Sequence, residues 1–180
     1  ASSEQIIAYL TIATLGNAID FGDLTSTRRG AANVSSDVRG IFGGGYISSN
    51  VNTIDYITIA TPSNATDFGD LTVARNSASG VSSDVRGVFG GGQTSTYDAT
   101  MDYITIATLG NATDFGDMTI ARMYYGAVSS NIRGIFGGGN TGSITNVIDY
   151  ITITTTGNAT DFGDLSVSRK SLAGVDNRLK

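Results

Sequence analysis

The sequence predicts an all-β fold, a β-propeller of four repeated units, and three observations support this. Residues 38–45 return almost unchanged as 85–92 and 132–139, a constant step of 47 residues. The block at 17–23 recurs with the same step. No stretch has a helical period, and the 24 glycines disfavour helix. Near-identical units made of short strands are typical of propeller blades, which bury their apolar faces against one another.

The unit at 76–122 illustrates the first two strands that we expect. Residues 80–83 are small and predict a short first strand, and Asp84 marks a turn. The apolar run 85–89, which ends on three glycines, predicts a second strand joined to the first as a hairpin.

The second half of this unit predicts two more strands. A polar connection at 93–100 leads to residues 101–108, whose alternating β-branched and aromatic side chains are typical of a strand. Turn residues 109–111 precede a fourth strand at 112–118, and the chain then crosses to the next unit. A parallel β-helix would have a rung about half as long, so the propeller is favoured.

The repeat divides a single domain of 180 residues into consecutive units, with approximate bounds 1–28, 29–75, 76–122, 123–169 and a closing segment 170–180. The first unit begins at its third strand, and the closing segment supplies only a first strand. We expect the two ends to share one composite blade, because propellers close in this way and lose a free sheet edge. That blade has no second strand, so it stays three-stranded or accepts a strand from an extension or another chain.

The order of residues within each unit resembles the kelch repeat. An arginine, a glycine doublet, a tyrosine and a fourth-strand aromatic stand at Arg75, Gly91-Gly92, Tyr103 and Phe115. The unit departs from that pattern by a Phe where kelch repeats usually carry Trp, and by a third glycine. The strings Asp-Tyr-Ile-Thr-Ile-Ala-Thr and Asn-Ala-Thr-Asp-Phe-Gly-Asp-Leu are also similar to repeats in virion and tail-fibre-associated proteins of marine tailed phages. The resemblance implies kelch-like blades of four antiparallel strands and a virion or extracellular location.

Composition removes several classes of function. Without cysteine or histidine, the chain has no disulfide, no thiolate zinc site, and none of the side chains that copper sites and most hydrolytic triads use. We therefore expect no enzymatic activity, metal or other cofactor, although the kelch-like copper oxidases are the nearest enzymes by fold. A net charge of −5 argues against nucleic acid as a partner. No apolar run is long enough to span a membrane, and no signal peptide begins this numbering.

Charged residues recur with the repeat and are expected to be structural. The motif Asp114-Phe115-Gly116-Asp117 matches the kinase motif by accident, because no phosphate loop or catalytic loop accompanies it. A calcium site is the alternative, but the two aspartates fall on opposite faces of a regular strand and a third ligand is missing. We expect them to accept backbone N–H groups and to pair with the periodic arginines. The structural set is Asp20, Asp23, Arg28, Arg39, Asp67, Asp70, Arg75, Arg86, Asp114, Asp117, Arg122, Arg133, Asp161, Asp164 and Arg169.

The glycines and aromatics of the unit are also expected to be structural. Residues 90–92 end a strand and open no helix, so crowding or a left-handed backbone explains them better than a phosphate loop does. The expected packing between blades uses Phe89, Tyr103, Phe115, Ile104 and Ile106, with an aromatic box for a ligand as the less favoured alternative.

The pattern Asn-X-Ser/Thr occurs at Asn33, Asn64, Asn111 and Asn158 and matches a glycosylation signal. Three of the four recur with the repeat. We interpret these three as turn residues that tolerate a left-handed backbone, and we infer no secretion from them.

The segments that break the repeat are the most informative about function. They lie after the second strand and after the fourth strand of each unit, at 46–53, 93–100, 140–147, 29–32, 76–79, 123–126 and 170–173. In a repeat scaffold the core is constrained, while loops can vary and bind; drift on an unselected surface is the alternative. The candidate binding residues are Tyr46, Asn50, Gln93, Tyr97, Asn140, Met123, Tyr124 and Tyr125.

These observations predict a non-enzymatic structural or attachment module, virion-associated, that presents its loops to a protein partner or a surface glycan. One alternative is a lectin unrelated to virions, in which Tyr124 and Tyr125 stack on sugar rings. Another is a homo-oligomer, either a ring or a filament, in which the incomplete blade accepts a strand from a neighbouring chain.

Overall fold

The computed structural model describes residues 4–175, in which fourteen β-strands and no helix are present. Three antiparallel sheets contain four strands each, in chain order. The first sheet comprises β3 (Ala32–Ser35), β4 (Arg39–Gly43), β5 (Thr53–Thr58) and β6 (Thr66–Asp70). The second comprises β7 (Ser79–Ser82), β8 (Arg86–Gln93), β9 (Tyr97–Thr105) and β10 (Thr113–Asp117). The third comprises β11 (Gly126–Ser129), β12 (Arg133–Gly137), β13 (Val147–Thr152) and β14 (Thr160–Asp164). The all-β prediction is confirmed.

The last two strands of each sheet contain a bulge at the phenylalanine of the Asp-Phe-Gly-Asp block. In the second sheet Asp114 pairs with Asp102 and Gly116 pairs with Met101, so Phe115 has no residue opposite it. Gly116 has a φ of 132°, a backbone conformation that favours glycine. The same irregularity occurs in the first and third sheets. A glycine inside a strand pattern signals such a bulge. The predicted fourth strand at 112–118 is present as β10, and the bulge interrupts its regular pairing.

An N-terminal hairpin completes the set of strands. It consists of β1 (Glu4–Tyr9) and β2 (Ile19–Arg28), which form a two-stranded sheet. Its pairing of Ile7 with Gly22 repeats the pairing of Ile54 with Gly69 in the first sheet. The hairpin is therefore equivalent to the last two strands of a sheet.

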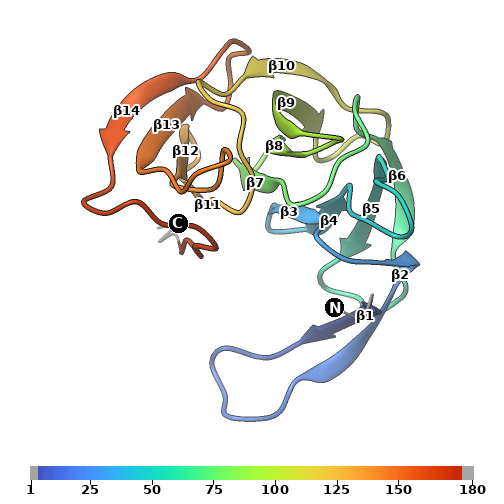
Figure 1. Cartoon of the computed structure of the whole chain (residues 1–180). Helices are drawn as coiled ribbons and strands as arrows, with labels where there is room; N and C mark the ends of the chain where they lie inside the picture. The colour runs from blue at the N-terminus through green and yellow to red at the C-terminus, as the bar shows by residue number, and fades with distance from the viewer. Residues whose placement is uncertain (1–3, 176–180) are drawn as a thin grey trace.

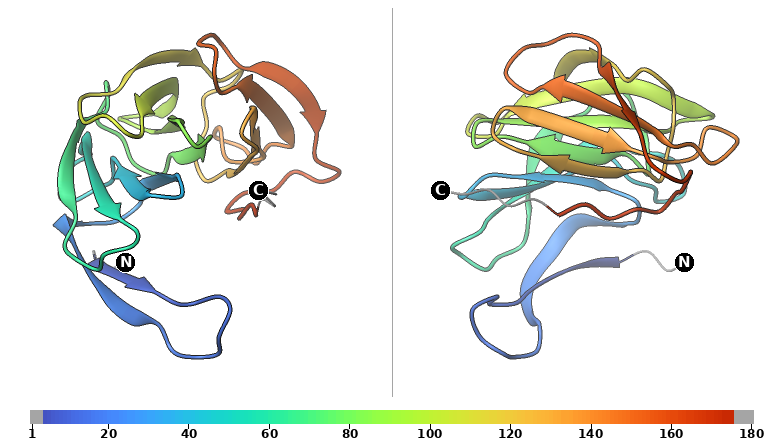
Figure 2. Two further views of the ribbon diagram at one scale, coloured as in Figure 1. Left: turned by 180° about the vertical axis from the view of Figure 1, so that it is seen from behind. Right: turned by 90° about the vertical axis from the view of Figure 1, so that its left-hand side faces the viewer.

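The three sheets form an arc that is open on one side (Figure 1). The strands β3, β7 and β11 lie toward the inside of the arc, and β6, β10 and β14 lie along its outside. The hairpin extends from one end, and residues 170–175 lie at the other end beside β11, as the second view also shows (Figure 2).

The expected composite blade is not formed among residues 4–175, and no closed ring is shown. The sheet of β1 and β2 has only two strands. Its hydrogen bonds hold it to the first sheet, whereas the segment around Gly174 packs closely against Ala127 of the third sheet. Residues 176–180 lie outside the described part of the chain.

Serine hydroxyls tie the inner strands together. The Oγ of Ser82 donates to the carbonyl of Ser35 at 2.8 Å, and the backbone N–H of Ser82 donates to Oγ of Ser129 at 3.2 Å. Both steps span 47 residues, so one small polar position of the repeat links all three sheets.

The apolar core lies between successive sheets. One cluster joins Ile41 and Phe68 of the first sheet to Phe89 and Ile104 of the second. A second cluster joins Phe115 in the same way to residues of the third sheet, including Phe136 and Ile151. Phe89, Phe115, Ile104 and Ile106 are all at most 3 % exposed, which confirms the predicted packing. Tyr103 is half-buried against the second cluster.

The connection between the second and third strands differs from the expectation in one sheet. Residues 93–100 were predicted to be a connection, but in the second sheet Gln93 pairs with Tyr97 and Gly92 with Asp98. These pairs prolong β8 and β9 into a hairpin. In the first and third sheets the second strand ends at Gly43 and Gly137 instead.

Candidate functional site

Three periodic arginines are completely buried in ion pairs. Arg75 NH2 lies 2.8 Å from Oδ2 of Asp102, with both side chains 0 % exposed. Arg28 and Arg122 meet Asp55 and Asp149 in the same geometry. Each arginine lies at or just after the end of the last strand of one unit, and each aspartate lies on the third strand of the next. The pairs thus fasten neighbouring units together.

These partners differ from the predicted ones. The sequence led us to pair the arginines with the Asp-Phe-Gly-Asp carboxylates, whereas the true partner precedes the tyrosine of the third strand, as Asp102 precedes Tyr103. Strand register decides this, because Asp102 faces the core while Asp114 is exposed. The signal in the sequence was an aspartate recurring inside an otherwise apolar strand.

Burial disfavours the charged forms of the arginines and aspartates in these pairs. Burial lowers the pKa of the Arg122 guanidinium, and the charge of Asp149 partly offsets this. Burial likewise raises the pKa of Asp102, which the Arg75 charge and a hydrogen bond from Thr72 oppose. Because the pairs are sealed from solvent, no substrate can reach them, and their role is structural.

The second set of arginines packs on tyrosines. The guanidinium carbon of Arg86 lies 4.3 Å from the ring centroid of Tyr103, and NH1 donates to the carbonyl of Ile153 at 3.1 Å. Arg39 repeats both contacts one unit earlier. These arginines therefore also join one sheet to the next through a cation–π contact and a backbone hydrogen bond.

The Asp-Phe-Gly-Asp block forms a junction between sheets. Asp20 and Asp161 accept the N–H of Gly22 and Gly163 through their side chains, as expected for carboxylates that accept backbone N–H groups. Within residues 4–175, no group of three or more Asp or Glu side chains lies close enough together to hold a metal ion.

The recurring asparagine has a role that the sequence did not indicate. Oδ1 of Asn111 accepts the N–H of Asp70 at 3.1 Å, and Asn64 and Asn158 repeat this bond. The left-handed turn that we expected is not found, because the described non-glycine residues with positive φ are Ser77, Tyr124 and Ser171. The asparagine is retained for a hydrogen bond to the preceding unit.

The glycine triplet is explained by crowding and by its backbone. Gly92 has a φ of 104°, and a Cβ there would lie 2.5 Å from the carbonyl oxygen of Asn76. The N–H of Gly92 donates to the carbonyl of Arg122 at 2.9 Å. The expectation of crowding with a left-handed backbone is confirmed, and nothing here forms a phosphate cradle.

The segments that break the repeat come together on one face. Successive strands alternate in direction, so the connections after the second and after the fourth strand emerge on the same side of the arc. Isolated bridges join them pairwise, Arg29 with Tyr46, Asn76 with Gln93, and Met123 with Asn140. We call this surface, made of residues 29–32, 46–53, 76–79, 93–100, 123–126 and 140–147, the variable face.

Polar side chains connect neighbouring loops of the variable face. Nδ2 of Asn50 donates to the carbonyls of Gln93 and Thr94, each at 3.0 Å, and its Oδ1 accepts from Asn76 at 2.6 Å. In the unit at 123–169, Oδ1 of Asn140 accepts the N–H of Gly142 at 3.0 Å. Asn50 and Asn140 therefore shape the loops on which other side chains are presented.

Among the candidate tyrosines, three lie at the variable face and one does not. Arg29 lies over the ring of Tyr46 at 4.7 Å, Tyr97 is half-buried, and Tyr124 is 44 % exposed. Tyr125 is 3 % exposed, and its hydroxyl donates to the carbonyl of Gly90 and accepts from the N–H of Ser79. It is a core residue and offers no ring to a ligand.

The repeat itself could have revealed the burial of Tyr125. The equivalent residues one and two units earlier and one unit later are Ala78, Ala31 and Leu172, so the position is apolar throughout. Those equivalent to Tyr124 are Gly30, Ser77 and Ser171, which are small or polar. Adjacent positions therefore point to opposite sides.

Comparison with protein-family models and with curated proteins gives no match for this chain. The described part of the chain contains no helix that could cross a membrane.

Proposed function

We propose that the chain is a non-enzymatic attachment module in which kelch-like propeller blades present the variable face to a surface glycan or a protein partner. The observation that carries the proposal is the pairing of the repeat-breaking loops of the variable face along one side of a uniform scaffold. A scaffold whose buried residues recur while its loops differ can change its binding without loss of fold. The proposal includes a location on a virion. It is supported by the similarity of the repeated strings to repeats in virion and tail-fibre-associated proteins of phages.

The chemistry of the variable face favours a sugar as the ligand. Tyr124 offers an exposed ring, and Tyr46 and Tyr97 lie on the neighbouring loops. Aromatic faces stack on the apolar faces of sugar rings, while the loop amides and hydroxyls supply hydrogen bonds. Recognition by a lectin outside a virion would use the same residues.

Binding of the 180-residue chain to a glycan array tests the proposal. We expect Tyr124→Ala to weaken the binding of a retained glycan by roughly tenfold or more, because an aromatic contact is lost. Leu109→Ala is the matched control, since Leu109 is 51 % exposed on a connection between third and fourth strands, outside the variable face. Equal loss in both variants would contradict the proposal, as would hydrolysis of an ester, glycoside or phosphate that disappears when the Asp-Phe-Gly-Asp residues are changed.

A further inference from the structure

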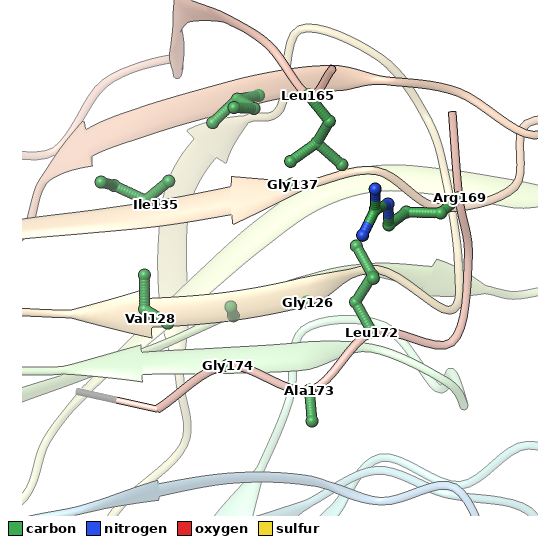
Figure 3. Close-up of a pocket in the computed structure, with 11 residues that line it drawn as sticks. Gly126, Val128, Ile135, Gly137, Leu165, Arg169, Leu172, Ala173 and Gly174 are labelled. Atoms are coloured by element: carbon green, nitrogen blue, oxygen red, sulfur yellow. The ribbon is translucent and has the colours of Figure 1, made fainter. Parts of the chain in front are cut away.

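The third sheet exposes the face that the first two sheets bury. Phe115 and Met118 of the unit at 76–122 are 2 % and 4 % exposed, whereas Phe162, the equivalent of Phe115, is 51 % exposed. Leu165, the equivalent of Met118, lines an apolar pocket of about 260 Å³ together with Val128 and Ile135 (Figure 3). We call the surface formed by Val128, Ile135, Ile148, Phe162 and Leu165 the terminal face.

The N-terminal hairpin exposes residues of the complementary kind. Ile104 and Ile106, which pack on the first sheet, are 3 % and 2 % exposed. Their equivalents in the hairpin are Leu10 and Ile12, which are 59 % and 94 % exposed. Ala18 is exposed too, although its equivalent Ala112 is 9 % exposed in the core. We call Leu10, Ile12 and Ala18 the hairpin tip.

The junctions inside the arc show how such surfaces fit. Between the first and second sheets, the N–H of Gly110 donates to the carbonyl of Phe68 at 2.9 Å and that of Ala112 to Asp70 at 2.7 Å. A Cβ at Gly116 would lie 2.6 Å from the carbonyl oxygen of Gly157 in the following unit. Gly163, its equivalent on the third sheet, has nothing within 4 Å. The terminal face thus retains the geometry of a junction, and no sheet among residues 4–175 occupies it.

A second pair of exposed residues extends this match. Val81, on the inner strand of the second sheet, is 2 % exposed, and its equivalent Val175 is 92 % exposed. Ile59 is 44 % exposed although its equivalent Ile106 is buried. Val34, the equivalent of Val175 in the unit at 29–75, packs in one cluster with Ile106. Val175 of one copy and Ile59 of another would therefore meet in a junction of the same kind.

We propose that copies of this chain associate head to tail, with the hairpin tip of one copy seated on the terminal face of the next. The hairpin of the same copy is held at the opposite end of the arc. Asp23 accepts there from the N–H of Ala65 at 2.8 Å, and Arg28 forms its buried ion pair with Asp55 at 3.0 Å. A second copy supplies the occupant without breaking these bonds. The proposal is independent of the ligand of the variable face, which lies on another surface.

One residue of the hairpin sets the strength of this contact. Ala8 stands where Asp55, Asp102 and Asp149 stand in the other units, and Arg169 is the equivalent of their buried arginine partners. In the head-to-tail junction Arg169 therefore faces an alanine. An aspartate at this position would restore the periodic ion pair, so residues 1–180 with alanine there associate more weakly than with an aspartate.

Light scattering of the 180-residue chain over a wide concentration range tests the proposal. We expect masses above the 18.6 kDa of a single copy at high concentration. Ile12→Lys and Phe162→Lys should each weaken association roughly tenfold or more, because each buries an unpaired charge at the junction. Leu15→Lys is the matched control, since Leu15 is 106 % exposed and its equivalent Leu109 is also exposed. Circular dichroism establishes that each variant is folded.

Mixing the two defective variants separates association from closure of one chain on itself. The Ile12→Lys copy retains its terminal face and the Phe162→Lys copy retains its hairpin tip, so the mixture forms one intact junction and a two-copy species. A closed ring and a growing filament both contain the proposed junction and both support it. A single-copy mass at every concentration, an equal effect of Leu15→Lys, or a mixture without association would overturn the proposal.

A gain of affinity tests the register of the junction. Ala8→Asp should tighten association about tenfold by supplying Arg169 with a charged hydrogen-bond partner. The same change combined with Arg169→Ala should give no gain. An Ala8→Asp chain that associates no more tightly would overturn the proposed register. Because Ala8 is exposed in the single copy, this variant is expected to fold normally.

Discussion

Each buried arginine meets its aspartate across a boundary between units, in a place that water does not reach. The NH1 and NH2 groups of Arg122 donate there to Asp149 at 2.9 Å and to the carbonyls of Val147 and Phe136 at 2.8 and 3.1 Å. Thr119 donates to the same carboxylate. A buried pair of this kind contributes little net stability, but loss of one member leaves a charge without compensation.

Removal of one carboxylate should therefore be costly. Asp149→Ala is expected to lower the free energy of unfolding by about 3–5 kcal/mol, because the Arg122 guanidinium stays buried without its acid. Asp161→Ala, in the exposed Asp-Phe-Gly-Asp block, should cost about 1 kcal/mol or less. Urea unfolding of both variants measures the difference. Equal losses would show that the block, and not the buried pair, holds the units together.

Tyr125 provides a test by pH. Burial raises its pKa to about 12, with the N–H of Ser79 acting in the opposite direction. An unfolded tyrosine titrates near about pH 10, so the folded chain keeps a proton that the unfolded chain loses. The resulting stabilisation is complete below about pH 10 and is lost as the pH rises toward 12. Tyrosinate absorbance should show a step near pH 12 that Tyr125→Phe removes, and the same absorbance profile in both proteins would contradict this.

At the scale of the element, the same strand is a core strand or a surface strand according to its neighbour. The bulge that carries Phe115 in β10 also carries Phe162 in β14, and both rings make a T-shaped contact with a tyrosine of their own sheet at 6.1 and 5.9 Å. Only Phe115 has a further sheet packed over it. The two phenylalanines have the same local sequence and local structure, so their different exposure comes from whether a following unit covers them.

Comparison of Phe115 with Phe162 measures how much one junction between sheets contributes to stability. Phe115→Ala should destabilise the chain by about 3–5 kcal/mol, and Phe162→Ala by about 1 kcal/mol or less, since its ring is already half in water. Thermal unfolding at a dilution where single copies predominate measures both. Similar losses would mean that contacts within the sheet, and not between sheets, provide the stabilisation.

At the scale of the molecule, protection should decrease from the middle of the arc to its ends. The second sheet is packed on both faces, the third on one, and the hairpin of β1 and β2 has only two strands. Units that contact only their neighbours open locally from the ends. Hydrogen exchange should therefore be slowest in β8 and β9 and fastest in β1. Uniform protection along the chain would indicate a single cooperative unit instead.

The sequence repeat predicts some features of the fold and of the candidate site, and leaves others undetermined. Period and alternation indicate the strands, their order and the core aromatics such as Phe89, because burial between like units leaves the same apolar residues each time. They do not report register across strands, so the partner of Arg75 was misassigned. Nor do they separate neighbours such as Tyr124 and Tyr125 unless each is compared with its equivalents. The open arc of the three sheets depends on the angle between sheets, which no single residue encodes.

The hydrogen bonds of Ser82 to Ser35 and Ser129 have a genetic consequence. Each bond spans 47 residues and joins one unit to a near copy of itself. An in-frame duplication of 47 codons that copies one of these serines would therefore insert a sheet whose two junctions already have their serine partners. Recombination between units can lengthen or shorten the array in single steps, and each product would exchange one variable loop set for another while the joints between sheets stay the same.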